Sequence, residues 1–311
     1  MAKQKAQNPE DFIMPLNMNG LQGRMLHMPA PNKKRTREIL LIYGHHALIE
    51  RWWGLAQNLN AYGAVTIPDL PGFGGMDSFH KIGKKPTIDN YADYLAAFIK
   101  LRYKRRRVTI AGISFGFVVV TRMLQRYPEL ANRIDFVISI VGFMHRDDFL
   151  FTPRDHFIAQ HGCRVVSWTP IAFFVRHVCL NKFVIRTIYK HWGRAKHRVT
   201  DILPEQFNDM LDMEVVMWQA NDVRTHWATT SEFLDVDNCG VPINLPVWHV
   251  RTLKDHYFDN NIVEQHMRVV FSDYRQADAN ISSHTPSVLA GKKEFYPFLP
   301  AKLRRALAAR P

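Results

Sequence analysis

The chain has 311 residues, 47% of them hydrophobic, and a formal net charge of +13. This length and apolar content allow one large core with an inserted segment. The three cysteines, Cys163, Cys179 and Cys239, are odd in number and lack framework spacing, which argues against a disulfide scaffold and for a reducing compartment. No apolar run reaches membrane-spanning length and residues 1–5 lack a signal core, so we expect a cytoplasmic protein with no membrane insertion.

Strand-like and helix-like segments alternate through the first half of the chain. Apolar runs predict strands, and apolar residues at helical spacing predict the helices between them. The expected strands are 38–43, 64–67, 108–111 and 136–141, and the expected helices are 48–59, 89–101 and 117–127. This alternation predicts an α/β fold with a mostly parallel sheet covered by helices on both faces.

The segment Gly112-Ile113-Ser114-Phe115-Gly116 joins a predicted strand to a predicted helix. A G-x-S-x-G sequence in this context is typical of a sharp turn that presents a serine nucleophile. Residues two positions before and after the serine need almost no side chain, because the backbones approach closely there. The following helix directs its first N–H groups at the place where an oxyanion would form. Ser114 is therefore a candidate nucleophile.

The chain resembles the α/β-hydrolase family in four separated segments. Besides the elbow, Tyr43-Gly44-His45 ends a predicted strand, and Asp69-Leu70-Pro71-Gly72-Phe73-Gly74 resembles the D-x-x-G-x-G loop of that family. The fourth segment lies near the carboxyl terminus. Two positions depart from the family pattern: Tyr43 stands where His is common, and Phe117 where a small residue is frequent. Neither departure removes a catalytic atom.

The resemblance implies a triad in the chain order Ser, acid, His. The predicted strand 246–253 leads to Asp255, which we expect to be the acid, and a further predicted strand, 269–277, leads to His284, the expected base. Asp259 is the reserve for the acid. Asp147 and Asp148 are weaker alternatives, because some family members place the acid after the strand behind the elbow.

The same resemblance assigns the oxyanion hole to the backbone N–H groups of His45 and Phe115. The bulky Phe115 is expected to narrow the acyl pocket. The side chains of His45 and His46 have two interpretations, one at the mouth of the site and the other, more common for paired loop histidines, in solvent.

Residues 145–219 interrupt the strand-helix alternation with apolar helix-like stretches. In the family this position holds the cap, so we expect a core of 1–144 and 220–311 with a helical cap of 145–219. A helix over 220–234 is expected to return the chain to the sheet.

The basic runs are spread over core and cap and favour a solvated basic surface without nucleic acid. They lie at 32–35, 100–107, 186–198 and 302–305.

The function implied is hydrolysis of carboxylic esters, including lactones, through an acyl-enzyme, with a small-molecule ester or lactone as substrate. Thioesterase, peptidase and carbon–carbon bond hydrolase activities remain open, because the triad does not choose the leaving group. The alternative class is a non-catalytic protein of this fold that senses a ligand or binds a partner. The sequence lacks phosphate-loop and dinucleotide motifs, and its histidines lack zinc spacing, so we expect no cofactor and no metal.

Overall fold

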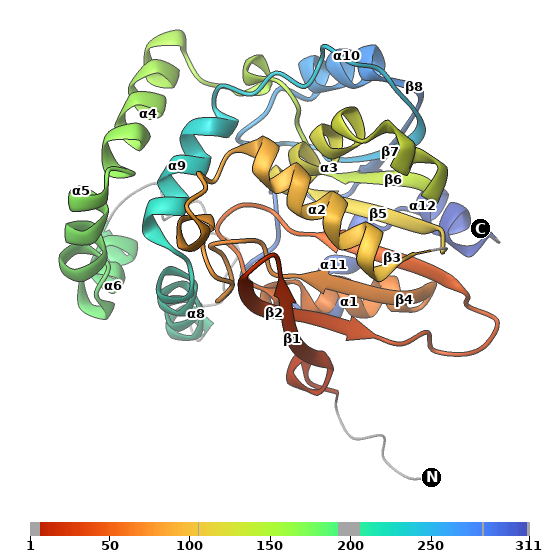
Figure 1. Ribbon diagram of the computed structural model, residues 1–311, viewed down its shortest axis with the longest axis horizontal. Coiled ribbons are helices and arrows are strands. Elements are labelled where there is room, and N and C mark those ends of the chain that lie inside the picture. The colour runs from red at the N-terminus through yellow and green to blue at the C-terminus, as the bar shows by residue number, and fades with distance from the viewer. Residues whose placement is uncertain (1–6, 105, 192–205, 282, 310–311) are drawn as a thin grey trace.

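The computed structural model describes residues 7–104, 106–191, 206–281 and 283–309. Its centre is an eight-stranded sheet with strand order β1-β2-β4-β3-β5-β6-β7-β8 (Figure 1). The strands are β1 (Ile13–Met18), β2 (Leu21–Met28), β3 (Arg37–Ile42), β4 (Gly63–Pro68), β5 (Val108–Ile113), β6 (Ile134–Ile140), β7 (Ile243–Thr252) and β8 (Phe271–Ala279). From β4 to β8 neighbouring strands are parallel, which confirms the predicted mostly parallel sheet.

An antiparallel hairpin at the edge of the sheet was not predicted. Strands β1 and β2 pair with each other, and β2 pairs antiparallel with β4. Between them Asn19 and Gly20 both have positive φ, 52° and 81°. An Asn-Gly pair with this backbone is the favoured two-residue hairpin turn, so a local signal was present in the sequence.

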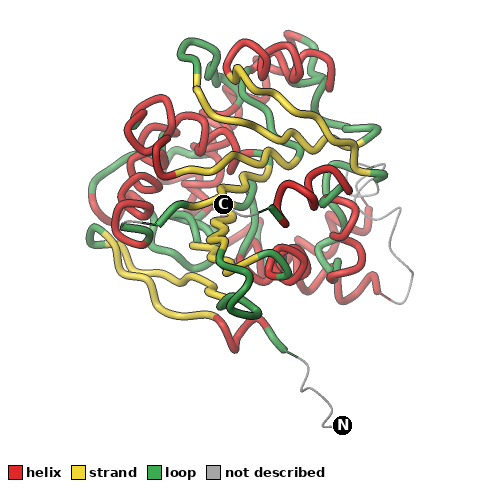
Figure 2. Tube along the Cα trace, turned by 90° about the vertical axis from the view of Figure 1, so that its right-hand side faces the viewer, coloured by secondary structure: helices red, strands yellow, loops and turns green. Residues whose placement is uncertain are grey.

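Helices cover both faces of the sheet (Figure 2). Helix α1 (Trp53–Asn60) packs against α11 (Lys292–Phe295), whereas α2 (Ile88–Arg102) packs against α3 (Phe115–Arg126). Strand order explains this division. The connection from β3 to β4 runs one way along the sheet and those from β4 to β5 and from β5 to β6 run the other way, so right-handed crossovers place their helices on opposite faces. Helix α10 (Asn260–Val270) precedes β8, and α12 (Ala301–Ala308) ends the fold.

The central strands are buried along their whole length. Every residue of β4 and β5 is buried, as expected for parallel strands with helices on both sides. The last strand differs from its prediction, because helix α10 continues to Val270 and β8 begins at Phe271, two residues later than expected.

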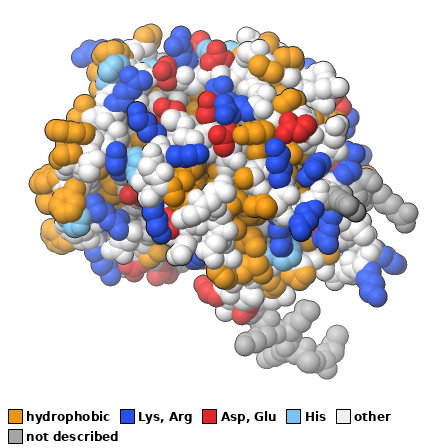
Figure 3. Space-filling view, viewed as in Figure 1, with side chains coloured by type: hydrophobic (Ala, Val, Ile, Leu, Met, Phe, Trp, Pro, Cys, Tyr) orange, Lys and Arg blue, Asp and Glu red, His pale blue; other side chains and the backbone are white. Residues whose placement is uncertain are grey.

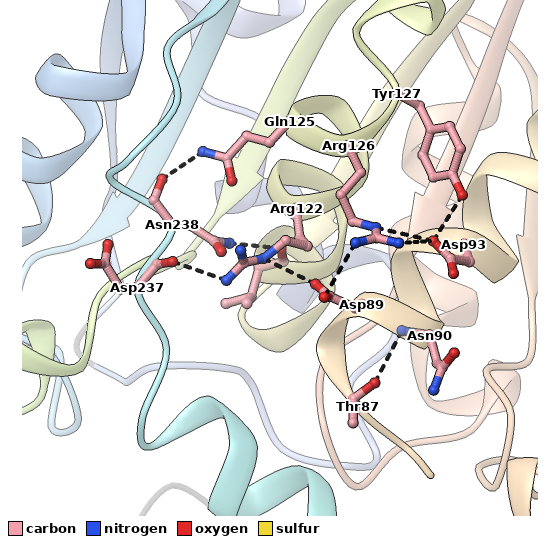
Figure 4. A network of polar contacts seen from close by, with 11 residues as sticks. Thr87, Asp89, Asn90, Asp93, Arg122, Gln125, Arg126, Tyr127, Asp237 and Asn238 are labelled. Atoms are coloured by element: carbon pink, nitrogen blue, oxygen red, sulfur yellow. Dashed lines mark hydrogen bonds and ion pairs between the residues drawn. The ribbon is translucent and has the colours of Figure 1, made fainter. Parts of the chain in front are cut away.

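A polar network fastens α3 to α2 and to the loop before β7 (Figure 4). Arg126 pairs with Asp93 at 3.0 Å, and Arg122 lies 3.6 Å from Asp89. The Gln125 side chain donates to the Asn238 carbonyl at 2.7 Å. These contacts fix the helix that begins directly after the predicted nucleophile, Ser114.

Between β6 and β7 the principal described elements are helices (Figure 1). They are α4 (Pro153–Val166), α5 (Thr169–Phe174), the π-helical η6 (Val175–Cys179), α6 (Lys182–His191), α8 (Phe207–Ala220) and α9 (Val223–Phe233). Helix α9 lies within the helix predicted over 220–234 and packs against α4. Residues 192–205 of the predicted cap, which include most of the basic run 186–198, lie outside the described residues, as do residues 1–5.

Candidate active site

Ser114 occupies a strained turn between β5 and α3. Its backbone has φ 49° and ψ −119°, a conformation that non-glycine residues rarely adopt. The flanking glycines make this turn possible. A Cβ on Gly112 would lie 2.6 Å from Phe117 Cα, and one on Gly116 would lie 2.6 Å from the Tyr43 carbonyl oxygen. The turn thus has the tight packing that the G-x-S-x-G spacing predicts.

Backbone hydrogen bonds join the loops at the carboxyl ends of four adjacent strands. Ser114 N–H donates to the Ile140 carbonyl at 3.0 Å, and Val141 N–H donates to the Val250 carbonyl at 2.8 Å. The next link runs from Leu253 N–H to the Ile281 carbonyl, at 3.2 Å. The elbow after β5 and the loops after β6, β7 and β8 therefore form one connected edge, where ligands bind in open α/β sheets.

Asp255 and His284 meet at this edge. Asp255 Oδ2 lies 2.6 Å from His284 Nδ1, and its side chain is buried. Its other oxygen accepts backbone N–H bonds from Tyr257 at 2.8 Å and Phe258 at 3.3 Å. Burial acts to raise the pKa of Asp255, but the hydrogen bond and charge of His284, with the backbone donors, hold it below the ordinary value. The ionised carboxylate orients the imidazole, so these two residues have the geometry of an acid–base pair.

The alternative acids make other contacts. Asp259 caps α10 by accepting from Asn261 N–H at 2.8 Å. Asp148 is fully buried and lies 2.6 Å from Nδ1 of a different histidine, His266, on α10. Asp147 is exposed. The structure therefore brings Asp255, and none of these three, to His284.

The His45 loop runs beside the elbow. A Cβ on Gly44 would lie 3.4 Å from Ser114 Cβ, and the rings of His45 and Phe115 meet edge to face with centroids 5.8 Å apart. Phe115 is the first residue of α3, and the first N–H groups of a helix have no acceptor within it. The two backbone segments expected to form the oxyanion hole are thus neighbours at Ser114.

The interpretation of His45 and His46 as solvated residues is wrong. His45 Nε2 lies 2.8 Å from Thr229 Oγ1 on α9, and His46 is buried against Trp218 on α8. These rings fasten the loop to the inserted helices, because an imidazole offers both a packing face and a polar nitrogen. The backbone of His46 is also strained: like Ser114 and Val141 it has positive φ, and all three lie at the same edge of the sheet.

Aromatic rings connect the elbow to the His284 loop. Phe233 on α9 contacts Phe115 at 5.9 Å and Phe143 also at 5.9 Å between ring centroids. Phe143 stacks on Phe258 at 4.5 Å, and Phe258 contacts the His284 ring at 5.3 Å. Phe115, expected to narrow the acyl pocket, is buried as part of this cluster. Phe233 and Phe258 were not predicted from the sequence, because aromatic residues have no spacing that marks them as neighbours.

The departure at Tyr43 has a structural explanation. The buried Tyr43 hydroxyl donates to Asp69 Oδ1 at 2.8 Å and accepts from Leu70 N–H at 2.9 Å. Arg24 on β2 donates to the other Asp69 oxygen at 3.0 Å. Burial raises the pKa of Asp69 to about 7 although Arg24 opposes the shift. Tyr43 therefore ties the end of β3 to the Asp69 loop. The local sequence around Tyr43 does not predict this contact.

The described ranges contain no group of three or more His, Cys, Asp and Glu side chains arranged to hold a metal. His197 lies outside them, and so does Ser282 in the loop before His284. A surface cavity of about 440 Å³ lies between Asp77, Arg176 and Asp222. None of the five predicted site residues lines it.

No helix in the described part of the chain is long and apolar enough to cross a membrane.

The sheet topology, the elbow and the adjoining loops define a protein of the α/β-hydrolase fold. A solved thermophilic esterase from Thermogutta terrifontis superposes with a TM-score of 0.64 at 15% identity, covering 96% of this chain and 98% of that one. An enol-lactonase from Burkholderia xenovorans LB400 superposes with a TM-score of 0.60 at 14% identity, covering 86% and 91%. At such identities the likeness concerns the fold.

The sequence comparisons add one partial relative. Methylesterase 1 of Arabidopsis thaliana is 26% identical over 113 residues, which are 36% of this chain. The chain spans 41% of the length of that relative. No family model matches the chain.

Proposed function

We propose that this protein is a serine hydrolase that cleaves carboxylic esters, with lactones opened by the same steps. The observation that carries the proposal is the contact of buried Asp255 with His284, at 2.6 Å, in loops tied by backbone hydrogen bonds to the edge that bears Ser114. Support for the ester class comes from the names of the methylesterase, esterase and enol-lactonase to which the chain is similar.

In the proposed mechanism His284 removes the hydroxyl proton of Ser114 while Oγ attacks the carbonyl carbon of the ester. Asp255 holds the imidazole through Nδ1 and stabilises the imidazolium that forms. The N–H groups of His45 and Phe115 donate to the oxyanion. The alcohol leaves with the proton from His284, and water deprotonated by His284 then attacks the acyl carbon and releases the acid.

The proposal includes a cap formed by residues 145–219 over a core of 1–144 and 220–311. Supporting it, helix α8 within this segment reaches the loop beside Ser114 through Trp218, whose ring contacts His46 with centroids 4.2 Å apart. A cap in this position excludes water and shapes the cavity that selects the acyl group. The substrate is a small molecule.

The test is hydrolysis of short-chain aryl esters and simple lactones by the wild type and Ser114→Ala. Loss of the nucleophile should lower kcat by about 10⁴-fold or more. The melting temperature should stay close to that of the wild type or rise, because Ala keeps the strained backbone of position 114 with a smaller side chain. Equal rates for the two proteins, or no turnover of any ester or lactone by the wild type, would contradict the proposal and favour a ligand-sensing or partner-binding protein. Thioesters, amides and β-diketones in the same panel test the thioesterase, peptidase and carbon–carbon bond hydrolase activities, respectively.

A further inference from the structure

The inserted helices expose an unusual number of large apolar side chains. Phe157, Trp168 and Phe183 are 60%, 64% and 78% exposed, values high for aromatic residues. Further exposed apolar residues lie on α4, α5 and η6 and are Ile158, Val165, Phe173, Phe174 and Val178. We call these eight residues the cap apolar face. Scattered exposed apolar residues are ordinary, but a contiguous set marks an interaction site.

The cap apolar face lies on the outer side of the molecule. Helix α4 packs against α9 and buries Gln160 and Cys163, whereas Ile158 and Val165 project from the opposite side at helical spacing. Helices α4, α5 and α6 follow one another along one edge of the molecule, farther from the sheet than α9 (Figure 1). The space-filling view shows hydrophobic side chains along this edge with Lys and Arg among them (Figure 3).

The charge around this face is positive. Residues 150–189 contain only one acidic residue, Asp155. Their five cationic side chains are Arg154, Arg164, Arg176, Lys182 and Arg186. Three of them form ion pairs: Arg164 with Asp235, and Lys182 and Arg186 with Asp212. Arg176 donates to the backbone carbonyls of Trp218 and Gln219, which are neutral, and Arg154 is exposed on the same side of α4 as Ile158.

We propose that the cap apolar face binds peripherally to an anionic lipid surface. Exposed Phe and Trp side chains insert at the boundary between headgroups and acyl chains, and the surrounding Arg and Lys attract anionic headgroups. Helices lying in the interface plane with an apolar side toward the lipid are the known form of such binding. The chain is then held at the membrane by helices that lie along the lipid surface.

Charge favours lipid over a second copy of the chain as the occupant. A symmetric dimer through this face would bring the cations of one copy toward those of the other, because a two-fold interface pairs a patch with itself. An anionic bilayer neutralises the same cations. The formal net charge of +13 on the whole chain adds to the attraction.

The experiment measures flotation of the full chain with phosphatidylcholine vesicles, either pure or containing about 30% phosphatidylserine, in low and high salt. The wild type should partition onto the anionic vesicles at least about tenfold more than onto the neutral ones, and less in high salt. The double substitution Ile158→Ser with Trp168→Ser should lower that partitioning about tenfold. Leu101→Ser is the matched control, because Leu101 is 61% exposed on α2, away from the cap apolar face, and should change it less than about twofold.

A milder variant covers the case in which the double substitution fails to fold. Brominated lipid should quench the tryptophan fluorescence of the wild type, and Trp168→Phe should remove most of that quenching while vesicle binding remains. The proposal is overturned by absent or salt-independent binding, by equal loss in the Leu101 control, or by unchanged quenching in Trp168→Phe. A wild type that dimerises in sedimentation velocity without binding vesicles would identify a second copy as the occupant. Ester hydrolysis enters none of these measurements, so they stand apart from the proposed activity.

Discussion

At the residue scale, the structure assigns different surroundings to carboxylates that look equivalent in the sequence. Asp255 and Asp259 lie four residues apart in one loop, yet the first contacts His284 and the second caps α10. Asp148 is a second buried carboxylate paired with a histidine, His266. Pairing of a buried carboxylate with a histidine is therefore not by itself a catalytic mark. The partner distinguishes Asp255, because His284 lies in the loop after β8 at the edge that bears Ser114, whereas His266 lies within α10.

The first residue prediction compares the two neighbouring acids. Asp255→Asn should lower kcat for aryl esters by about 10⁴-fold, because the amide holds the imidazole in the wrong tautomer. Asp259→Asn, its matched control, keeps a capping side chain and should leave kcat within about twofold. Steady-state kinetics checks both variants. The reverse order of effects would make Asp259 the functional acid.

A second residue prediction concerns His249 on β7, which is buried with Nδ1 3.0 Å from Ser139 Oγ. Burial lowers its pKa to about 3, assisted by the charge of Arg251. The unfolded chain takes up this proton near the ordinary pKa, so the stability that neutral His249 provides is complete above about pH 6.5 and is lost as the pH falls toward 3.

The measurement is urea unfolding of the wild type and His249→Gln at several pH values. Between about pH 6 and pH 4 the free energy of unfolding should fall more steeply in the wild type, by up to about 1.4 kcal/mol per pH unit. Glutamine keeps a hydrogen-bonding group beside Ser139 but does not titrate. Parallel pH profiles would show that His249 is not held neutral by the fold.

At the element scale, the elbow depends on how closely α3 approaches β3. A Cβ on Gly116 would collide with the backbone of Ile42 and Tyr43, which cannot move without shifting the strand. The N-terminus of α3, which would support the oxyanion, can thus approach β3 only because Gly116 has no side chain. The network from Arg122 and Arg126 to α2 adds exposed ion pairs, which contribute little individually but orient the same helix (Figure 4).

Two glycine substitutions test this packing. Gly116→Ala should destabilise the protein by more than about 3 kcal/mol and remove ester hydrolysis, because backbone must move to admit the methyl group. Gly162→Ala in α4 is the matched control. A Cβ there meets nothing within 4 Å, and replacing a helical glycine should stabilise by about 0.5–1 kcal/mol. Thermal and urea unfolding measure both, and a neutral Gly116→Ala would contradict the close-approach argument.

At the scale of the whole molecule, burial is unevenly distributed. All residues of β5 are buried, whereas α4 buries two residues and α5 only Ala172. Helices α4 and α5 are therefore held by a few buried residues, chiefly against α9, and the sheet by a continuous core. Such an arrangement permits the outer helices to open while the sheet stays folded.

Hydrogen exchange read by mass spectrometry tests this difference. Amides of α4 and α5 should exchange at least about 100-fold faster than those of β5 and β6, because local opening of the outer helices exposes little apolar surface. Anionic vesicles should slow exchange in α4, α5, η6 and α6, and leave β5 and β6 unchanged, if the cap apolar face binds lipid. Equal protection of helices and sheet would show one cooperative unit.

The sequence by itself determined the core fold, because its signals are local. Buried parallel strands read as apolar runs, and the elbow needs Gly112, Ser114 and Gly116 within five residues. The predicted mostly parallel sheet with helices on both faces is confirmed. The hairpin of β1 and β2 was missed although Asn19-Gly20 marked its turn, since its strands carry few of the apolar runs that identified the others.

Only the tertiary structure decided which distant side chains meet. Tyr43 and Asp69 are 26 residues apart, Asp255 and His284 are 29 apart, and His45 and Thr229 are 184 apart. Short side-chain contacts between such positions depend on strand order, loop course and helix packing, none of which a local pattern contains. For the same reason the exposed side of α4 became visible only once α9 covered the other, although each residue of that helix was already in the sequence.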